Sequence, residues 1–256
     1  MSIISIRDVW KEYQGQVVLE RINLEIEPGS FNLIVGASGC GKSTLLRMLL
    51  GQEQPSRGEI LLDGKVLPPE PGPDRGVVFQ RYSVFPHLTV RENVALGLEF
   101  IQSPIVGKLF GGARRRAIEK AEQYIELVGL DGSEDKYPSA LSGGMQQRLA
   151  IAQALITKPK VLLLDEPFGA LDPGIRGDMH DLIIRIWEES KTTIFMVSHD
   201  LSEAFYLGTR LVTLDRRRNR PEEQGLYGAS ITHDIAITRR RENRHRGIEL
   251  AEGDVL

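Results

Sequence analysis

The chain contains, at residues 31–44, the sequence Phe31-Asn32-Leu33-Ile34-Val35-Gly36-Ala37-Ser38-Gly39-Cys40-Gly41-Lys42-Ser43-Thr44. Its first five residues form a short apolar run and predict a buried strand. The remainder fits the pattern Gly-x-x-x-x-Gly-Lys-[Ser/Thr] in full. Residues 44–50 then predict a helix that ends at Gly51. Because the glycine-rich loop lies between a strand and a helix, the match predicts a phosphate site rather than a chance glycine-rich turn.

The residue types in this loop explain how it could hold phosphates. Glycines let the backbone wrap tightly, so that amide N–H groups point at phosphate oxygens, and the helix that follows adds its dipole. Lys42 is expected to reach the β- and γ-phosphates, and the Ser43 hydroxyl is the expected Mg²⁺ ligand. Cys40 occupies a free position of the pattern and is interpreted as a passive spacer.

Composition limits the possible classes of protein. A chain of 256 residues fits one large domain, or one domain with an inserted subdomain. The net charge of -3 offers no overall basic field for nucleic acid. No apolar run approaches the roughly 18 to 20 residues that span a bilayer, and no secretory signal is visible. The single cysteine, Cys40, excludes an internal disulfide and favours a reducing compartment, the cytoplasm.

The pattern of elements predicts an α/β fold. Residues 17–26 alternate apolar and polar as a half-buried strand does, and Asp63-Gly64 indicates a hairpin. Further short buried strands are predicted at residues 76–79, 161–164, 193–197 and 211–214. Because strands alternate with helices, we expect a largely parallel sheet. The arginine-rich stretch from Arg216 onward is assigned no element.

The stretch from about residue 86 to 157 predicts helices alone. Thr89 and Glu92 form a capping box, and the second helix stops at Gly129. Ser142 can cap a third helix that runs to about Thr157. A further helix, capped by Asp172 with Pro173 in its first position, is expected between the strands at 161 and 193.

Two carboxylates follow the predicted strand at residues 161–164. Asp165 should emerge at the carboxyl edge of the sheet, where it can hold Mg²⁺ through water beside the phosphates. Glu166 would face the γ-phosphate, where a carboxylate can orient and deprotonate an attacking water. A simple strand end followed by a turn is the alternative, which the phosphate loop disfavours.

Six motifs in one order resemble the ATPase subunits of ABC transporters. They are similar to Walker A (Gly36, Ala37, Ser38, Gly39, Cys40, Gly41, Lys42, Ser43 and Thr44), the Q-loop glutamine Gln80, the signature Leu141–Met145, Walker B (Val161–Asp165, then Glu166), the D-loop Ala170–Asp172 and the switch histidine His199. The resemblance implies an α/β fold: a P-loop NTPase (RecA-like) core with an antiparallel β subdomain and an inserted α-helical subdomain. It assigns residues 1–85 and 158–215 to the nucleotide-binding core, 86–157 to the helical subdomain and 216–256 to a short C-terminal tail.

The resemblance also implies a site shared between two copies. In a head-to-tail dimer, each ATP would lie between the loop at residues 36–44 of one copy and Ser142, Gly143 and Gly144 of the other. Glu166 would be the base, with Gln80 touching Mg²⁺ and the attacking water. His199 would contact the γ-phosphate and help fix Glu166. Tyr13 would stack on adenine, with Trp10 the weaker alternative, and Asp172 would bridge the interface unless it serves only as a helix cap.

The branch of the family is inferred from what the sequence contains. One nucleotide domain, a short helical insert and no membrane helices leave a separate importer or exporter subunit. The stretches Gly36–Gly41 and Phe168–Asp172 look like bacterial importers, and the whole is similar to the nitrate/sulfonate/taurine group. Such a subunit works at the cytoplasmic face of the inner membrane with an integral permease and, indirectly, a periplasmic or lipid-anchored solute-binding protein. The alternatives are a solute such as a urea- or guanidine-like compound, or a non-transport ABC ATPase.

Two surfaces are left with competing interpretations. An apolar cluster after Gln80 is expected to receive a short helix of the permease, or else to pack locally; it comprises Tyr82, Val84, Phe85, Pro86 and Leu88. The arginine-rich tail would meet anionic lipid, the permease or the second copy, or form a solvated basic face.

Overall fold

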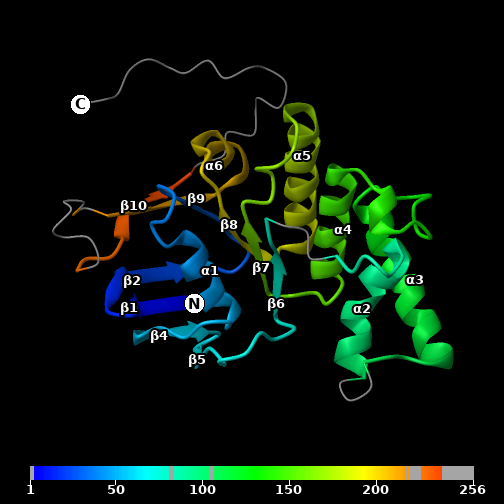
Figure 1. The fold of residues 1–256 in the computed structure, drawn as a ribbon, viewed down its shortest axis with the longest axis horizontal. Helices are drawn as coiled ribbons and strands as arrows, with labels where there is room; N and C mark the ends of the chain where they lie inside the picture. The colour runs from blue at the N-terminus through cyan, green and yellow to red at the C-terminus, as the bar shows by residue number, and fades with distance from the viewer. Residues whose placement is uncertain (1–2, 81–83, 104–106, 217, 219–225, 238–256) are drawn as a thin grey trace.

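A computed structural model describes residues 3–80, 84–103, 107–216, 218 and 226–237. Its strands form two sheets (Figure 1). The smaller sheet is antiparallel, in the order β2-β1-β4-β5, with β1 at Ile4–Tyr13, β2 at Gln16–Ile26, β4 at Arg57–Leu62 and β5 at Lys65–Val66. The predicted hairpin at Asp63-Gly64 joins β4 to β5. Strand β1 was not predicted, because bulges interrupt its pairing with β2 and break its alternation.

The larger sheet carries the order β10-β9-β3-β8-β7-β6. Its strands are β3 (Phe31–Val35), β6 (Arg75–Val78), β7 (Val161–Asp165), β8 (Thr193–Val197), β9 (Arg210–Asp215) and β10 (Ser230–Ala236). All neighbouring pairs are parallel except β9 with β10. In this register Ile34 and Asp165 both pair with Val197, so β3, β7 and β8 end at one edge. The loops that follow these three strands therefore meet there.

The described helices are α1 (Lys42–Leu50), α2 (Val90–Gln102), α3 (Gly111–Leu127), α4 (Gly143–Leu155), α5 (Pro173–Ser190) and α6 (Leu201–Leu207), with one 3₁₀ turn at Pro138–Ala140. Between Val90 and Leu155 the described elements are all helical. The capping box of Thr89 and Glu92 is formed, and the Ser142 hydroxyl accepts a bond from the Met145 amide at 3.3 Å. Asp172 occupies the N-cap of α5, but its side chain makes no capping hydrogen bond, so only the position of that cap was predicted correctly.

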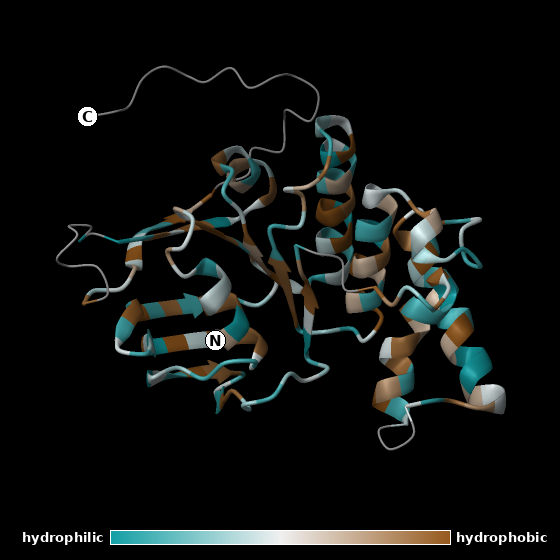
Figure 2. Ribbon diagram, viewed as in Figure 1, coloured by the Kyte–Doolittle hydropathy of each residue, from teal (hydrophilic) through white to brown (hydrophobic). Residues whose placement is uncertain are grey.

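Alternate residues of the larger sheet face two separate cores. Ile34, Leu163 and Phe195 pack with α1 and the smaller sheet, whereas Leu33, Leu164 and Met196 pack with α4 and α5. Figure 2 shows the central strands in brown, flanked by helices that alternate brown and teal. Helices α1 and α4 therefore cover opposite faces of this sheet, as the alternation of side chains along a strand requires.

The C-terminal stretch contains a strand that the sequence did not predict. Strand β10 pairs with β9, and Arg210 forms an ion pair with Asp234 at 2.6 Å. Just before it, Ala229 bridges to Leu19 of β2, so this segment joins the two sheets. Arg217, Arg220 and the arginines from 239 onward lie outside the described residues, and the basic-face interpretation of the tail stays untested for them.

Candidate active site

The glycine-rich loop lies at the carboxyl end of β3 and leads into α1. A Cβ atom on Gly36 would lie 2.1 Å from the Leu214 carbonyl oxygen, so only glycine fits there. Gly41 has a φ of 104° and begins α1 without a side-chain cap. The first amides of α1 are therefore not covered by a capping side chain, the arrangement that suits an anion. Burial raises the pKa of the Cys40 thiol, which fits a passive spacer rather than a reactive cysteine.

Lys42 points back into this loop. Its Nζ donates hydrogen bonds to the carbonyl oxygens of Gly36 at 2.7 Å and Ala37 at 3.0 Å. The side chain is nearly fully buried, so its ammonium is held at the loop and not free in solvent. A phosphate seated on the loop would meet this positive charge directly.

Ser43 and Asp165 form a pair of oxygen donors beside the loop. The Ser43 hydroxyl donates to Asp165 Oδ1 at 3.2 Å. Burial raises the pKa of Asp165, and the Ser43 hydrogen bond opposes that rise. Hydroxyl and carboxylate oxygens are hard ligands that suit Mg²⁺, which usually keeps waters and substrate phosphates as its other ligands. Within the described ranges no group of three or more His, Cys, Asp or Glu side chains is placed so that it could hold a metal ion.

Asp165→Asn is expected to stabilise the protein when nucleotide and metal are absent. The raised pKa means that the folded state binds the proton more tightly than the unfolded chain, whose value lies near 3.8. The charged form therefore opposes folding above the folded pKa, and this penalty is absent below the unfolded pKa. Asn removes the charge and can still accept from Ser43. We expect a rise in melting temperature of roughly 1–3 °C at neutral pH, since about 2–4 °C accompany each kcal/mol in a chain of this size.

Thermal unfolding in a chelator, at neutral and at acid pH, checks this expectation. The exposed Asp131→Asn serves as the matched control. The gain should shrink as the pH falls, because the wild-type carboxyl then takes up its proton. A lower melting temperature for Asp165→Asn at neutral pH would contradict it.

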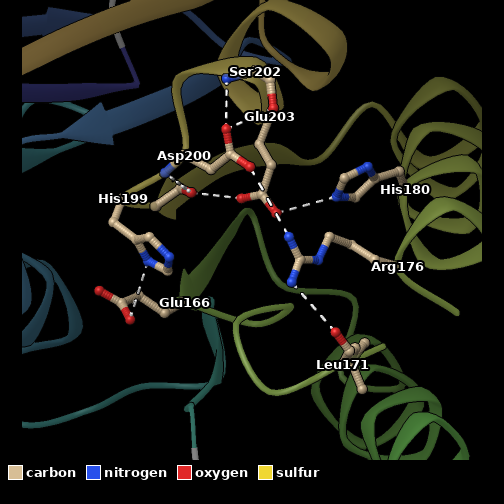
Figure 3. Close-up of polar contacts among 9 residues, drawn as sticks. Glu166, Leu171, Arg176, His180, His199, Asp200, Ser202 and Glu203 are labelled. Carbon is tan, nitrogen blue, oxygen red and sulfur yellow. Dashed lines mark hydrogen bonds and ion pairs between the residues drawn. The ribbon is translucent and has the colours of Figure 1, made fainter. Parts of the chain in front are cut away.

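Glu166 lies at the meeting point of three loops. Its Oε2 is 3.3 Å from Gln80 Nε2. The same oxygen lies 3.6 Å from His199 Nδ1 (Figure 3). Glu166 adopts a φ of 46°, a left-handed conformation that costs a non-glycine residue about 1–3 kcal/mol. Its amide is held by the Val197 carbonyl oxygen at 3.0 Å. The predicted base, glutamine and histidine are thus brought together around one carboxylate oxygen.

The start of α4 lies apart from this cluster. Ser142, Gly143 and Gly144 belong to the helix that packs on the opposite face of the larger sheet from α1. Among the described residues, no hydrogen bond joins them to residues 36–44. A Cβ on Gly144 would lie 2.7 Å from Ile175 Cγ2, so α4 begins in close contact with α5. One chain therefore does not complete the predicted ATP site.

Tyr13 ends β1 and is partly exposed. Its hydroxyl donates to the Glu53 carboxylate, and Lys11 Nζ lies 4.9 Å from its ring centroid. Burial raises the pKa of Tyr13, and the hydrogen bond to Glu53 and its negative charge raise it further. The Trp10 ring instead meets the guanidinium groups of Arg21 and Arg57, which lie 5.9 and 5.5 Å from its centroid. The contact of Glu53 with Tyr13 was not predicted, because nothing local in the sequence links positions 40 residues apart.

A groove lies beside the apolar cluster that follows Gln80. Its volume is about 550 Å³, and its apolar walls include Phe85, Leu88, Ala95, Phe100, Leu109 and Phe110. Val84 packs against the core, whereas Phe85 is partly exposed and its backbone is held by Asn93. Tyr82 lies outside the described residues. Within the cluster, Val84 therefore packs locally, whereas Phe85 lines an open groove that a partner could enter.

Comparisons with known proteins agree on the kind of protein. The family model described as ABC transporter matches residues 19–169. The chain is 45% identical over 218 residues to a nitrate import ATP-binding protein of Synechocystis, covering 85% of this chain and 78% of that protein. It is 42% identical over 218 residues to an aliphatic sulfonates import ATP-binding protein of Bacillus anthracis, covering 84% and 82% of the two chains.

Solved structures give the same result for the fold. A dimeric bacterial ABC transporter cassette superposes with a TM-score of 0.75 at 29% identity, covering 92% of this chain and 99% of that one. The same cassette in a dimeric post-hydrolysis state bound to ADP and Pi gives a TM-score of 0.74 at 28% identity, covering 92% of this chain and 99% of that one. The α/β fold predicted from the motifs is thereby confirmed. In the described part of the chain, no helix is long and apolar enough to cross a membrane.

Proposed function

The chain belongs to the ABC transporter family of ATPases, and from this premise we propose that it energises uptake of a small polar solute through a separate membrane permease. The observation that carries the proposal is the convergence of Lys42, the Ser43–Asp165 pair and Glu166 at one edge of the larger sheet. The nitrate and sulfonate importers among its relatives favour a small anion as the solute. A urea- or guanidine-like compound, or a role outside transport, is the alternative.

Each residue of the site has a proposed part in hydrolysis. Tyr13 would stack on adenine, and the amides of residues 36–44 would cradle the phosphates with Lys42 neutralising their charge. Ser43, Asp165 and Gln80 would hold Mg²⁺, which supplies charge neutralisation at the transferred phosphoryl group.

Three side chains would act on the attacking water. Glu166 would accept its proton while Gln80 orients it. His199 would contact the γ-phosphate and fix the Glu166 carboxylate, to which it already lies close. Their convergence on one carboxylate oxygen supports this assignment.

A second copy of the chain would complete the site. The start of α4 offers Ser142 and the amides of Gly143 and Gly144 as an anion site, on the opposite sheet face from its own phosphate loop. A head-to-tail dimer would place them on the partner's γ-phosphate. ATP bound across that interface favours the closed dimer, and hydrolysis removes the preference. The dimeric cassettes that the chain resembles support this arrangement.

The permease would dock on the groove beside Phe85. An apolar floor with a charged rim suits a short amphipathic helix from a membrane protein. Arg114 lies 3.5 Å from Glu92 and 4.0 Å from Glu99, so both signs of charge border the groove. We propose that the helical subdomain, residues 86–157, passes the state of the ATP site to the permease through Gln80. The protein would then sit at the cytoplasmic face of the inner membrane, with a solute-binding protein as an indirect partner.

Phe110→Asp is expected to abolish co-purification with a multi-span membrane protein while leaving ATPase activity within about twofold of the wild type. Phe110 is 73% exposed and lines the groove, so a charge there opposes docking without disturbing the core. Affinity purification from solubilised membranes, with mass spectrometry of the bound proteins, measures the effect.

Val66→Asp is the matched control, because Val66 is 65% exposed and lies on the smaller sheet. It should retain the membrane partner. Reproducible absence of any membrane protein with the wild type would favour the non-transport alternative. Equal loss in both variants would contradict the groove as the docking surface.

A further inference from the structure

A buried carboxylate lies behind the segment that carries His199. Glu203 of α6 is only 5% exposed, and both of its carboxylate oxygens have partners. Oε2 accepts a hydrogen bond from the Ser198 hydroxyl at 2.5 Å, and Oε1 lies 3.3 Å from Nε2 of His180 on α5 (Figure 3). A carboxylate oxygen accepts, so this contact is a hydrogen bond when Nε2 of His180 carries the proton. Glu203 thus ties the residue before His199 to α5.

A second connection runs parallel to the first, one turn earlier on α5. Arg176 lies 4.0 Å from the Asp200 carboxylate and donates to the Leu171 carbonyl oxygen at 3.3 Å. The Asp200 amide in turn donates to the Ser198 hydroxyl at 2.9 Å. Arg176 and His180 are four residues apart and share one face of the helix. Through these contacts this face of α5 is linked to two segments near Glu166. One is Leu171, five residues later in the chain, and the other is residues 198–200, which include His199.

His180 is also fixed by its ring. It meets Phe168 edge-on, with centroids 4.9 Å apart, and lies 5.7 Å from the Tyr206 ring. Phe168 is fully buried and follows Glu166 by two residues. The His180 ring, which contacts Glu203, is thus packed against the segment that carries Glu166.

His199 itself has little packing to hold it, because its side chain is 64% exposed. Its 3.6 Å approach to Glu166 depends on where the backbone of residues 198–200 lies. We propose that Glu203 and His180 are positioning residues that set His199 against Glu166 and make the segments before and after α5 move as one unit. The proposal rests on the roles given to Glu166 and His199 above. A displacement of about 1 Å in such a group can cost on the order of 100-fold in rate.

The test separates the hydrogen bond of His180 from its packing. His180→Phe keeps an aromatic ring against Phe168 but cannot donate to Glu203, whereas His180→Gln restores a donor. We expect His180→Phe to lower kcat for ATP about tenfold with KM within about twofold, and His180→Gln to recover most of the loss. In a His199→Ala background the effect of His180→Phe should vanish, as it must if His180 acts only through His199.

A second readout does not need activity. The ring Cε1–H signal of His199 in an NMR spectrum of the nucleotide-free protein should move in His180→Phe and return in His180→Gln. Unchanged kcat and an unchanged His199 signal in His180→Phe would overturn the inference, as would equal losses with and without His199. If the His199 signal moves as expected but the wild type does not hydrolyse ATP, the proposed function fails and the positioning stands.

Discussion

Glu166→Gln is expected to lower ATP turnover by about 10²–10⁴-fold, the range that a positioned general base contributes. The amide cannot accept the proton of the attacking water, yet it can keep the contact with Gln80 and leaves Lys42, Ser43 and Asp165 unchanged. ATP binding should therefore persist. Because hydrolysis would release the closed dimer in the proposed cycle, the variant should accumulate as a dimer in the presence of ATP.

Steady-state phosphate release and size-exclusion chromatography with and without ATP measure the two effects. Glu119→Gln removes an exposed carboxylate from α3 and serves as the control, with activity like that of the wild type. Turnover of Glu166→Gln near the wild-type rate would remove Glu166 as the base. Loss of ATP binding together with turnover would instead indicate a structural role for this residue, which already carries a left-handed backbone.

Mixing two inactive variants is expected to restore activity, because in the proposed dimer each site would take its parts from two chains. Lys42→Ala removes the ammonium held at the loop, and Ser142→Arg blocks the start of α4. Each variant alone should be almost inactive. In a mixed dimer, one site receives both changes and the other receives none. Random pairing makes half of the dimers mixed, so the mixture should recover about a quarter of wild-type activity when the two sites act independently.

The measurement is ATPase activity over a series of mixing ratios at constant total protein, and the recovery should peak at equal amounts. A double variant that carries both changes in one chain, mixed with either single variant, is the control and should remain inactive. A mixture no more active than its separate components would contradict a site shared in this head-to-tail manner.

Much of the site was predictable because the residues of each motif lie close together in the sequence. The loop at residues 36–44 requires glycines where backbone crowds, as at Gly36, and a lysine that reaches back to it. The capping roles of Thr89 and Ser142 follow from residue type and spacing, and both are present. Asp172 shows the limit of such reasoning, since the N-cap position was correct and the capping hydrogen bond was absent.

Contacts between distant segments could not be read in the same way. Gln80 and Glu166 are 86 residues apart, and they meet because β6, β7 and β8 are neighbours in a sheet whose order does not follow the chain. Tyr13 with Glu53 and His180 with Glu203 are likewise distant in the chain and meet only in the folded structure. Strand β10 was missed because none of its residues is buried, so it lacks the apolar pattern of a strand. Its pairing with β9 holds it in the sheet.

Local sequence was therefore sufficient for the phosphate loop, the acidic strand end, the helix starts and the family, because backbone geometry and phosphate chemistry constrain residues that are adjacent in the chain. Local patterns were not sufficient for the contact of Tyr13 with Glu53 or for the buried Glu203 behind His199. The neighbours of Glu166 and the sharing of the site between two copies were expected from the family resemblance alone. Those features depend on which strands lie side by side and on which face of the sheet each helix covers. Packing of the whole chain settles both, since each strand must bury its two faces against different partners.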